Sequence, residues 1–534
     1  MFWSIEGEAT PVPVGVPVSV PAPIGGLNAR DSLAAMPPSD APTLINWWPQ
    51  PFGLSVRKGY SEWATGMPAQ VNTIAQWANV TGSSKLFAWS SAGMYDVSTK
   101  AAVGAAIVAG LATSTWETCN LTNSAGSFLI ALAGNGTDNG IIYKVAGVAR
   151  LSLGDGIVVN TWAGIDPKNA KCPTVHQHRL WVLEKDSTNG WYLPPDAIQG
   201  TFVKYDFGPL FSRGGYAQAI GTWTLDDGNG AEDHLVVLSS KGEAVVFGGT
   251  NPSSDATWAL VGVYFVGAPV ASARVMTKAG GDLFIMTQQG VVSMTATLAS
   301  TKVNESDQRV TSNKVQFLFS ELTSLYGDSA GWDIDYFPKL NMLMVNIPIS
   351  TGINQQVVAN QILNSWTTFE SLDSACWATY GSDPYFGSST GKVYKFWDSY
   401  LDGVLIDGSG GIGVTATVVQ AYSYFGKMAT QKQVAMYRPT LFVGSETAVA
   451  AYISYDFEST IPTTPTALPP IGGSSWGSGL WGSAIWGGGQ DAQRPWFQAE
   501  GIGFAAAISM VVVAQDRVLW VATDYNVISG LGLL

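Results

Sequence analysis

Seven copies of one local pattern fill the middle of the chain, and this repetition constrains the fold more than any other feature. In each copy, two short apolar runs are joined by a turn that contains glycine or serine. The clearest copies occupy residues 235–247, 283–294 and 385–396, and looser copies occupy residues 86–97, 129–145, 180–193 and 342–358. Because glycine and asparagine readily adopt the backbone conformations of tight turns, each copy predicts a β-hairpin.

The spacing of these hairpins predicts a β-propeller. Their first residues lie 43 to 59 residues apart, and a strand-built repeat of roughly 40 to 50 residues is typical of propeller blades. We therefore expect an all-β protein with a propeller of six or seven blades over residues 61–400. The alternative is a series of unrelated hairpins in a β-sandwich, because the copies share shape more than residues.

The composition favours broad apolar contact surfaces and argues against a protein that binds DNA through its phosphates. Charged residues make up 13% of the 534 residues, whereas there are 60 glycines and 21 tryptophans. This balance suits many tight turns and large subunit contacts. The formal net charge of −13 opposes phosphate binding, which needs clustered lysine and arginine.

Signals for export, membrane insertion and cysteine chemistry are weak. Residues 1–15 contain no basic segment followed by an apolar core, so we expect no secretory signal. The most apolar windows, 101–112 and 504–514, are shorter than the ~20 residues of a spanning helix, so we expect no membrane span. Cys119, Cys172 and Cys376 lack CxxC spacing, which favours buried free thiols over disulfides or zinc ligands.

Proline shapes the first part of the chain. Residues 1–60 are predicted to form an extended arm, with its candidate docking residues at Pro11, Pro13, Pro17, Pro21 and Pro23. Proline fixes its own backbone and restrains the preceding residue, so the arm should be an edge strand or a polyproline segment. Because it is apolar and carries little charge, we expect it to dock on its own chain or a neighbour; the alternative is a flexible arm.

A second β domain is predicted over residues 401–534, after a glycine-rich boundary at 401–413. Within it, residues 459–495 interrupt the strands, and Trp476, Trp481 and Trp486 recur every five residues among glycine and serine. That period matches neither a helix nor a strand. A long loop in a compact domain is commonly functional, so these tryptophans are candidates for a distal tip or gate loop. The alternative is that the rings fold back on their own domain.

Short helices are expected only near residues 67–78 and 313–324. The rest of the chain is read as strands and turns.

Candidate chemical sites are few. His176 and His178 are expected on one face of a strand and could form half of a metal site, although a structural or surface role is favoured. The acidic stretch 226–230 resembles the start of a calcium loop but lacks the glutamate at the twelfth position, which favours an ordinary turn.

Paired carboxylates are the remaining catalytic possibility. Asp333 and Asp335, with Asp373 and Asp383 further along, could serve glycoside hydrolysis, but no spacing selects them among 40 acidic residues. The sequence contains no GxSxG, GxxxxGK[ST] or HExxH motif. We therefore expect no enzyme activity, no metal and no cofactor.

Several patches together resemble the tail nozzle proteins of short-tailed bacteriophages, also known as tail tubular or packaged-DNA-stabilisation proteins. The patches are PIGGLN at 23–28, residues 36–48, WDIDYFPKLNMLMVNIP at 332–348, residues 366–379 with 385–396, and YSYFGKMATQKQVAMYRP at 422–439. They occur in both halves of the chain, and each consists of ordinary residues without an active-site signature.

The resemblance implies a virion protein assembled in the cytoplasm of a bacterial host. Its fold would be a propeller joined to a second β domain, and six copies would form a tube below the portal adaptor. Tail spikes or fibres would bind its outer wall, and double-stranded DNA would pass through the lumen without sequence-specific contacts. The acidic charge is compatible with DNA that slides without sticking.

Two other functions remain open. A carbohydrate-binding propeller, as a lectin or receptor-recognition protein, would stack sugars on exposed tryptophans, but the blade tryptophans fall at different places in their hairpins. A propeller glycosidase would need Asp333 and Asp335 to face one pocket.

Overall fold

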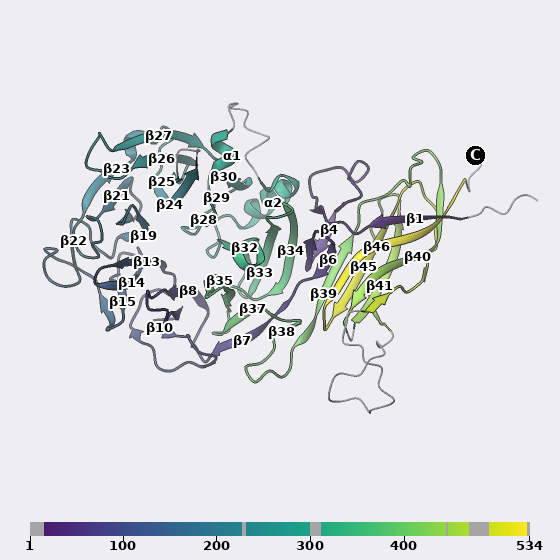
Figure 1. The fold of residues 1–534 in the computed structure, drawn as a ribbon, viewed down its shortest axis with the longest axis horizontal. Coiled ribbons are helices and arrows are strands. Elements are labelled where there is room, and N and C mark those ends of the chain that lie inside the picture. Colours follow the sequence, from purple (N-terminus) through teal and green to yellow (C-terminus); the bar gives the residue numbers. More distant parts are fainter. Residues whose placement is uncertain (1–14, 227–230, 300–310, 445–446, 469–490, 531–534) are drawn as a thin grey trace, which may run out of the picture. The chain divides into compact units, whose positions relative to one another are not determined.

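The computed structural model describes residues 15–226, 231–299, 311–444, 447–468 and 491–530, which are almost entirely β-strands and turns. The chain divides into two compact units. One is continuous, Lys58–Ile412, and the other combines Met1–Arg57 with Gly413–Leu534. Figure 1 shows the strands of each unit.

The unit Lys58–Ile412 is a β-propeller. Its described residues contain seven successive sheets, which we call blades 1 to 7. The innermost strands contact one another in order around a closed ring, from blade 1 through blade 7 and back to blade 1. Figure 1 shows these sheets arranged around a common centre. The prediction of an all-β propeller is confirmed.

Each blade is an antiparallel sheet that runs from the centre outward, and six of the seven contain four strands. Blade 1 contains β8 (Val71–Trp77), β9 (Lys85–Ser90), β10 (Gly93–Asp96) and β12 (Val108–Ala109). Blade 2 contains β13 (Glu117–Asn123), β14 (Gly126–Leu132), β15 (Ile141–Lys144) and β16 (Gly147–Arg150). Blade 3 contains β19 (Ala170–His176), β20 (Arg179–Glu184), β21 (Asn189–Tyr192) and β23 (Val203–Asp206). Blade 4 contains β24 (Ala217–Asp226), β25 (Ala231–Ser239), β26 (Glu243–Gly249) and β27 (Trp258–Phe265).

The last three blades differ more in detail. Blade 5 has three described strands, β28 (Met276–Ala279), β29 (Asp282–Thr287) and β30 (Gly290–Ser293). Blade 6 contains β31 (Asp333–Phe337), β32 (Met342–Ser350), β33 (Ile353–Asn360) and β34 (Ser365–Leu372). Blade 7 contains β35 (Cys376–Tyr380), β36 (Asp383–Gly387), β37 (Val393–Ser399) and β7 (Gly59–Thr65).

Blade 7 closes the ring with strands from both ends of the unit. β7 pairs antiparallel with β37, although more than 300 residues separate them. The ammonium of Lys392 lies 2.5 Å from the carboxylate of Glu62 across this junction. A ring closed in this way leaves no open seam between its first and last blades.

Every hairpin found in the sequence is the middle of one blade. The pairs β9–β10, β14–β15, β20–β21, β25–β26, β29–β30, β32–β33 and β36–β37 coincide with the seven predicted copies. These strands are apolar because both of their faces are covered by neighbouring blades. Leu235, Val236, Val237 and Leu238 of β25, for example, are all fully buried.

Short elements lie between and within the blades. Those between successive blades are β17 (Ser152–Leu153), β18 (Thr161–Ala163), η1 (Gly208–Leu210), α1 (Met294–Ala299), η2 (Asn313–Val315) and α2 (Gln316–Tyr326). Those within blades are β11 (Ala101–Ala102), β22 (Gly200–Thr201), which forms a small sheet with β17 and β18, and η3 (Pro338–Leu340); β38 (Leu401–Asp402) follows blade 7. The helix expected near 313–324 is present as η2 and α2. The helix expected near 67–78 is wrong, because that segment forms β8, the innermost strand of blade 1.

The other unit contains two sheets. The first has the order β43 (Asp491–Gln493), β40 (Lys432–Val443), β46 (Val518–Ser529), β6 (Gly53–Val56) and β5 (Trp47–Gln50), with β1 (Val16–Pro21) on β46 and β44 (Phe497–Gln498) on β40. The second has the order β4 (Thr43–Ile45), β39 (Ile412–Val419), β45 (Ala506–Ala514), β41 (Thr447–Tyr455) and β42 (Thr466–Ala467). A short parallel pair, β2 (Gly26–Leu27) and β3 (Asp40–Ala41), adjoins them.

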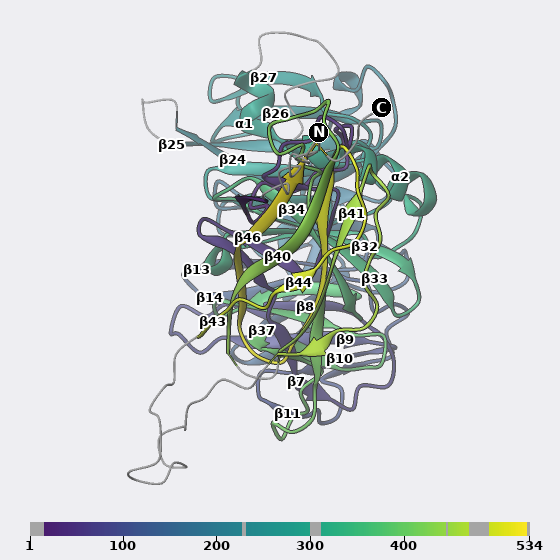
Figure 2. The same ribbon diagram turned by 90° about the vertical axis from the view of Figure 1, so that its right-hand side faces the viewer.

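The long strands of this unit have one covered face. Buried and less buried residues alternate along β40, the pattern of a sheet with one face on a core. Figure 2 shows β40 beside β46, its neighbour in the first sheet. Trp47 of β5 and Trp520 of β46 pack with their ring centroids 6.1 Å apart.

The first and last parts of the chain form one unit. Met1–Arg57 belongs to the same compact unit as Gly413–Leu534, where the sequence indicated an extended arm over 1–60, docked on its own chain or a neighbour, and a second β domain over 401–534. The reason is strand pairing, because β5 and β6 extend the sheet of β46 and β4 pairs with β39.

In the described part of the chain, no helix is long and apolar enough to cross a membrane.

Candidate functional site

The innermost strands of the seven blades surround a cavity of about 560 Å³, which we call the central cavity. One lining residue from each blade, or from the segment that leads into its first strand, is Thr73, Thr118, Thr174, Ile220, Arg274, Asp333 and Ala378. The middle of a propeller is a common place for ligands, so its charged side chains decide what this cavity could do.

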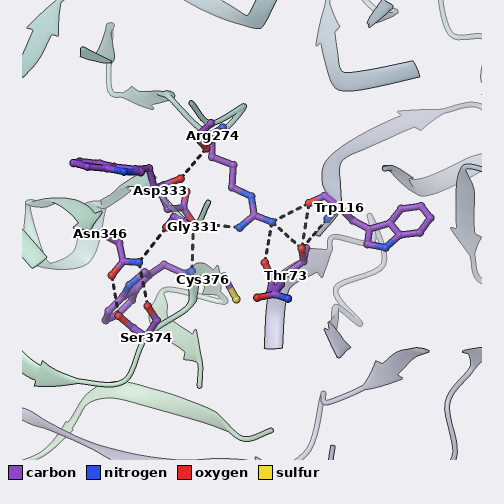
Figure 3. Close-up of polar contacts among 12 residues, drawn as sticks. Thr73, Trp116, Arg274, Gly331, Asp333, Asn346, Ser374 and Cys376 are labelled. Carbon is purple, nitrogen blue, oxygen red and sulfur yellow. Dashed lines mark hydrogen bonds and ion pairs between the residues drawn. The ribbon is translucent and has the colours of Figure 1, made fainter. Parts of the chain in front are cut away.

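Arg274 is the central charged group of the cavity (Figure 3). Its Nη2 donates hydrogen bonds to Thr73 Oγ1 at 2.7 Å, to the carbonyl of Trp116 at 2.9 Å and to the carbonyl of Asn72 at 3.1 Å. Its Nη1 lies 3.4 Å from Oδ2 of Asp333. One guanidinium therefore links blades 1, 2 and 6 to the segment that enters blade 5, and it acts as a clamp between blades.

The charge of Arg274 is balanced by acids on β31. Burial favours the neutral form of Arg274 and is the largest single effect, but the charges of Asp333, Glu117, Asp335 and Cys376 together outweigh it and raise the pKa of the guanidinium. Burial also raises the pKa of Asp333, an effect that Arg274 opposes. A buried charge needs such a partner, because an unpaired ion inside a protein is strongly destabilising.

Asp335 has no comparable partner. It lies two residues from Asp333, so both side chains project from the same face of β31 and both line the cavity. Burial, followed by the charge of Asp333, raises the pKa of Asp335 well above its ordinary value. Among the described residues, none donates a hydrogen bond to its Oδ2. The structure thus brings the two predicted carboxylates into one cavity, but it commits Asp333 to Arg274.

A buried polar network holds the link between blades 6 and 7. Nε2 of Gln356 donates to Oδ1 of Asn346 and to Oγ of Ser374, each at 2.9 Å. Nδ2 of Asn346 donates to the carbonyl of Ser374 at 3.0 Å. Figure 3 shows Asn346 and Ser374 beside the Arg274 cluster. This network fixes the position at which β35 enters the wall of the cavity.

The cysteines are free and shielded. Cys172 and Cys376 are buried, and Cys119 is partly buried. The backbone N–H of Cys172 donates to the carboxylate of Glu117, which fixes a bulge in β19 where Cys172 has φ +51°. Burial raises the pKa of Cys119 and of Cys376 to about 12, so neither thiol is poised as a nucleophile at neutral pH.

His176 and His178 do not share a strand face. His176 ends β19 and is buried, whereas His178 lies in the following turn with φ +58° and is exposed. The expectation that the two imidazoles lie on one face of a strand is therefore wrong, because the chain turns between the two residues. Within the residues the structure describes, no three His, Cys, Asp or Glu side chains are placed to hold a metal ion. Most of the acidic loop at 226–230 lies outside the described residues.

Some predicted docking residues can be located. Pro17 and Pro21 belong to β1, which pairs with β46 of the same chain, and Pro23 follows in a buried turn. Proline is compatible with this position because β1 is an edge strand. Pro11 and Pro13 lie outside the described residues, as do the candidate tip residues Trp476, Trp481 and Trp486.

Comparisons with known proteins yield only similarities of fold. No protein-family profile matches the chain, and no curated protein matches it. Among solved structures, the β-propeller domain of Cps50 (Swd1) from Myceliophteria thermophila is 10% identical, with a TM-score of 0.37 over 63% of this chain and 99% of that one. BBS1N in its complex with ARL6DN is 12% identical, with a TM-score of 0.38 over 65% of this chain and 99% of that one. YCF48 bound to D1 peptide is 8% identical, with a TM-score of 0.33 over 66% and 94%. The propeller assignment itself rests on the strand pairing described above.

Arg274 was not predicted from the sequence. It is a single arginine in an ordinary loop segment, and its partners lie between 59 and 202 residues away. No local spacing marks such a residue. The aspartates Asp333 and Asp335 were named as candidate paired carboxylates, but no cation was assigned to them.

Proposed function

We propose that this chain is a structural virion protein, the tail nozzle of a short-tailed bacteriophage. Six copies would enclose the channel through which the genome is retained and ejected, below the portal adaptor. The observation that carries the proposal is the match between the sequence resemblance and the architecture. The resemblance implies a propeller joined to a second β domain, and the chain contains a propeller and a second β unit.

The charge of the chain supports this role. A net charge of −13 gives a surface that repels phosphates on average. Packaged DNA in such a channel would pass without sequence-specific binding. The low content of charged residues, 13%, leaves room for large subunit contacts with other copies and with spikes or fibres.

The contacts inside the propeller favour a scaffolding role over an enzymatic one. The guanidinium of Arg274 is occupied by three blade contacts and by Asp333. A catalytic pair of carboxylates needs one acid and one base or nucleophile that are free to act on a sugar bond. The commitment of Asp333 to the clamp therefore argues against the glycosidase alternative.

Most tryptophans of the blades give no support to the carbohydrate-binding alternative, although Trp191 and Trp397 are only partly buried. Trp89, Trp181, Trp223 and Trp366 are fully buried in the propeller, and Trp258 is buried in blade 4. Sugar stacking requires an exposed ring face.

Native mass spectrometry and immunoelectron microscopy test the proposal. We expect the purified chain to form a six-fold ring, alone or with its adaptor, and an antibody against it to label a short tail below the portal of particles from a bacterial lysate. Label on fibres, or only on free protein, would reject the nozzle and favour a receptor-recognition protein.

The Trp/Gly-rich loop is the proposed distal gate. Deletion of residues 474–489, which removes Trp476, Trp481 and Trp486, should leave both units folded and reduce the fraction of particles that retain DNA. The control is a variant in which residues 474–489 are replaced by a glycine/serine segment of the same length. If the deleted chain fails to fold, the tryptophans are core residues and the gate is excluded.

A further inference from the structure

A groove of about 640 Å³ lies on blade 6, between α2 and the turn that joins β32 to β33. Leu318, Leu322 and Leu325 of α2 form one side, and Ile349 and Ile353 contribute from the hairpin. Leu325 is 64% exposed and Ile353 is 60% exposed. The groove is therefore a concave apolar surface that this propeller does not cover.

The apolar surface of the helix α2 is only partly covered by the propeller. Phe319 is fully buried, and its ring lies perpendicular to that of Trp366 with centroids 6.0 Å apart. Leu318, Leu322 and Leu325 are spaced at i, i+4 and i+7, which places them in one stripe along the helix. Leu322 is buried and helps Phe319 to anchor α2, whereas Leu325 at the end of the stripe stays exposed.

The groove is acidic as well as apolar. Glu321, Glu370 and Asp373 line it, and the lining contains no lysine, arginine or histidine. A smaller hollow of about 240 Å³ adjoins it and likewise has no basic residue. The two hollows share Ile349, Gly352, Asn354 and Asp373, so together they form one elongated surface with Asp373 at the junction.

Asp373 is held in place at that junction. Its Oδ2 accepts a hydrogen bond from Oγ of Ser389 at 2.7 Å, and the carboxylate also accepts the backbone N–H of Ser389 at 3.1 Å. A carboxylate accepts more hydrogen bonds than these two, so it can also bind a cation. A fixed acid beside an apolar groove suits a ligand that has an apolar group and a positive charge close together.

We propose that this groove binds an amphipathic, basic segment of a partner polypeptide. An apolar side chain of the segment occupies the space between Leu325 and Ile353, and a lysine or arginine pairs with Asp373. The elongated outline fits a peptide, and the three acids disfavour an anionic lipid surface. They also disfavour a second copy of this acidic chain. The inference stands whether or not the protein is a tail nozzle.

Fluorescence anisotropy of the full chain with two labelled peptides tests the proposal. The probes are a short peptide of alternating leucine and lysine and its counterpart with glutamate in place of lysine. We expect the Leu/Lys peptide to bind and the Leu/Glu peptide not to bind. We expect Ile353→Asp to weaken binding by about tenfold, which corresponds to ~1.4 kcal/mol, and Asp373→Asn to weaken it by a similar factor and to reduce its salt dependence.

Matched variants separate the groove from general attraction to an acidic protein. Ile362 is 66% exposed in the turn between β33 and β34, outside both hollows, so Ile362→Asp should bind as the unmodified protein does. Asp407 accepts hydrogen bonds from the N–H and Oγ of Ser409, as Asp373 does from Ser389, so Asp407→Asn is the equivalent loss of charge at a distant loop. Thermal melting of all four variants checks their folding.

Three results would overturn the proposal. The first is no binding of the Leu/Lys peptide, and the second is equal binding of both peptides. The third is an equal loss of affinity in the groove variants and their matched controls, which would indicate non-specific attraction.

Discussion

Arg274 lies beside two acids on one face of β31, and only Asp333 forms an ion pair with it. Asp333 neutralises a guanidinium that cannot leave the cavity without breaking contacts to blades 1 and 2. Asp335 has no hydrogen-bond donor at Oδ2 among the described residues, and burial raises its pKa well above the ordinary value. Two aspartates on one strand face thus have different energetic roles.

Asparagine substitutions should separate these roles. We expect Asp333→Asn to destabilise the propeller by about 3 kcal/mol, because it removes the charge of the one acid that pairs directly with the buried Arg274. We expect Asp335→Asn to stabilise it. The pKa of Asp335 is raised in the folded state, so its effect on stability is most favourable below pH 3.8 and becomes unfavourable as pH rises towards its raised pKa.

The measurement is urea denaturation at neutral pH. If both substitutions shift the free energy of unfolding in the same direction, Arg274 does not distinguish the two carboxylates.

His176 should make the propeller sensitive to acid. Burial lowers its pKa from 6.5 to about 4, and neither ring nitrogen has a hydrogen-bond partner among the described residues. Asp233, His234 and Lys278 are the charged or titratable groups that act on it. The unfolded chain therefore takes up a proton at a higher pH than the folded one, and stability is lost as pH falls from 6.5 towards 4.

The expected contribution of His176 is up to about 3 kcal/mol between pH 7 and pH 4. His176→Phe keeps an aromatic ring against Trp258, whose centroid lies 5.9 Å away, and removes the titration. Its free energy of unfolding should fall less steeply with acid than that of the unmodified chain. His178→Phe, at an exposed position, is the control. Identical pH dependence in all three proteins would contradict this role for His176.

At the scale of single elements, substitutions in β1 test whether the proline-rich arm stabilises its own unit. Val20 is 9% exposed and faces the same side of the sheet as Val16, which is 59% exposed at the outer end of the strand. We expect Val20→Asp to detach β1 from β46 and to lower the free energy of unfolding of that unit by about 2 kcal/mol.

Val16→Asp serves as the control and should have almost no effect. Differential scanning calorimetry measures both variants. A wild-type melting curve for Val20→Asp would mean that β1 contributes only to contacts with other chains.

Elements with strong local signals were predicted well. The hairpins at 235–247 and 283–294 were found because glycine turns separate runs of apolar residues, and both strands and turns are local in sequence. The segment 67–78 was misassigned because alanine and glutamine favour helices in isolation. In the protein it pairs with β9, and this tertiary contact determines its conformation.

At the scale of the whole molecule, the propeller contains all the strands that close its own ring. β7 and β37 both belong to Lys58–Ile412. Stability in such a chain can be lost one unit at a time. We therefore expect two unfolding transitions in calorimetry and a folded fragment 58–412 that retains the transition of the propeller. A single transition, together with an unfolded fragment, would show that the units are not independent.

The division into units could be predicted only in part. The glycine-rich segment at 401–413 marked the end of the propeller because turn residues are visible in the sequence. The joining of Met1–Arg57 to Gly413–Leu534 was missed because it depends on pairs such as Val18 with Tyr525, which no local pattern reveals. The pairing of Arg274 with Asp333 was missed for the same reason.

The pairing of β1 with β46 also sets an order of events during synthesis. The ribosome must add roughly 500 residues after β1 before β46 exists, which takes on the order of 25 to 100 s at ordinary rates of synthesis. During that interval β1 cannot pair with β46, because the residues of the propeller are still being synthesised. Prolines at positions 17 and 21 remove two of its backbone donors, so the waiting strand is a poor template for pairing with other nascent chains.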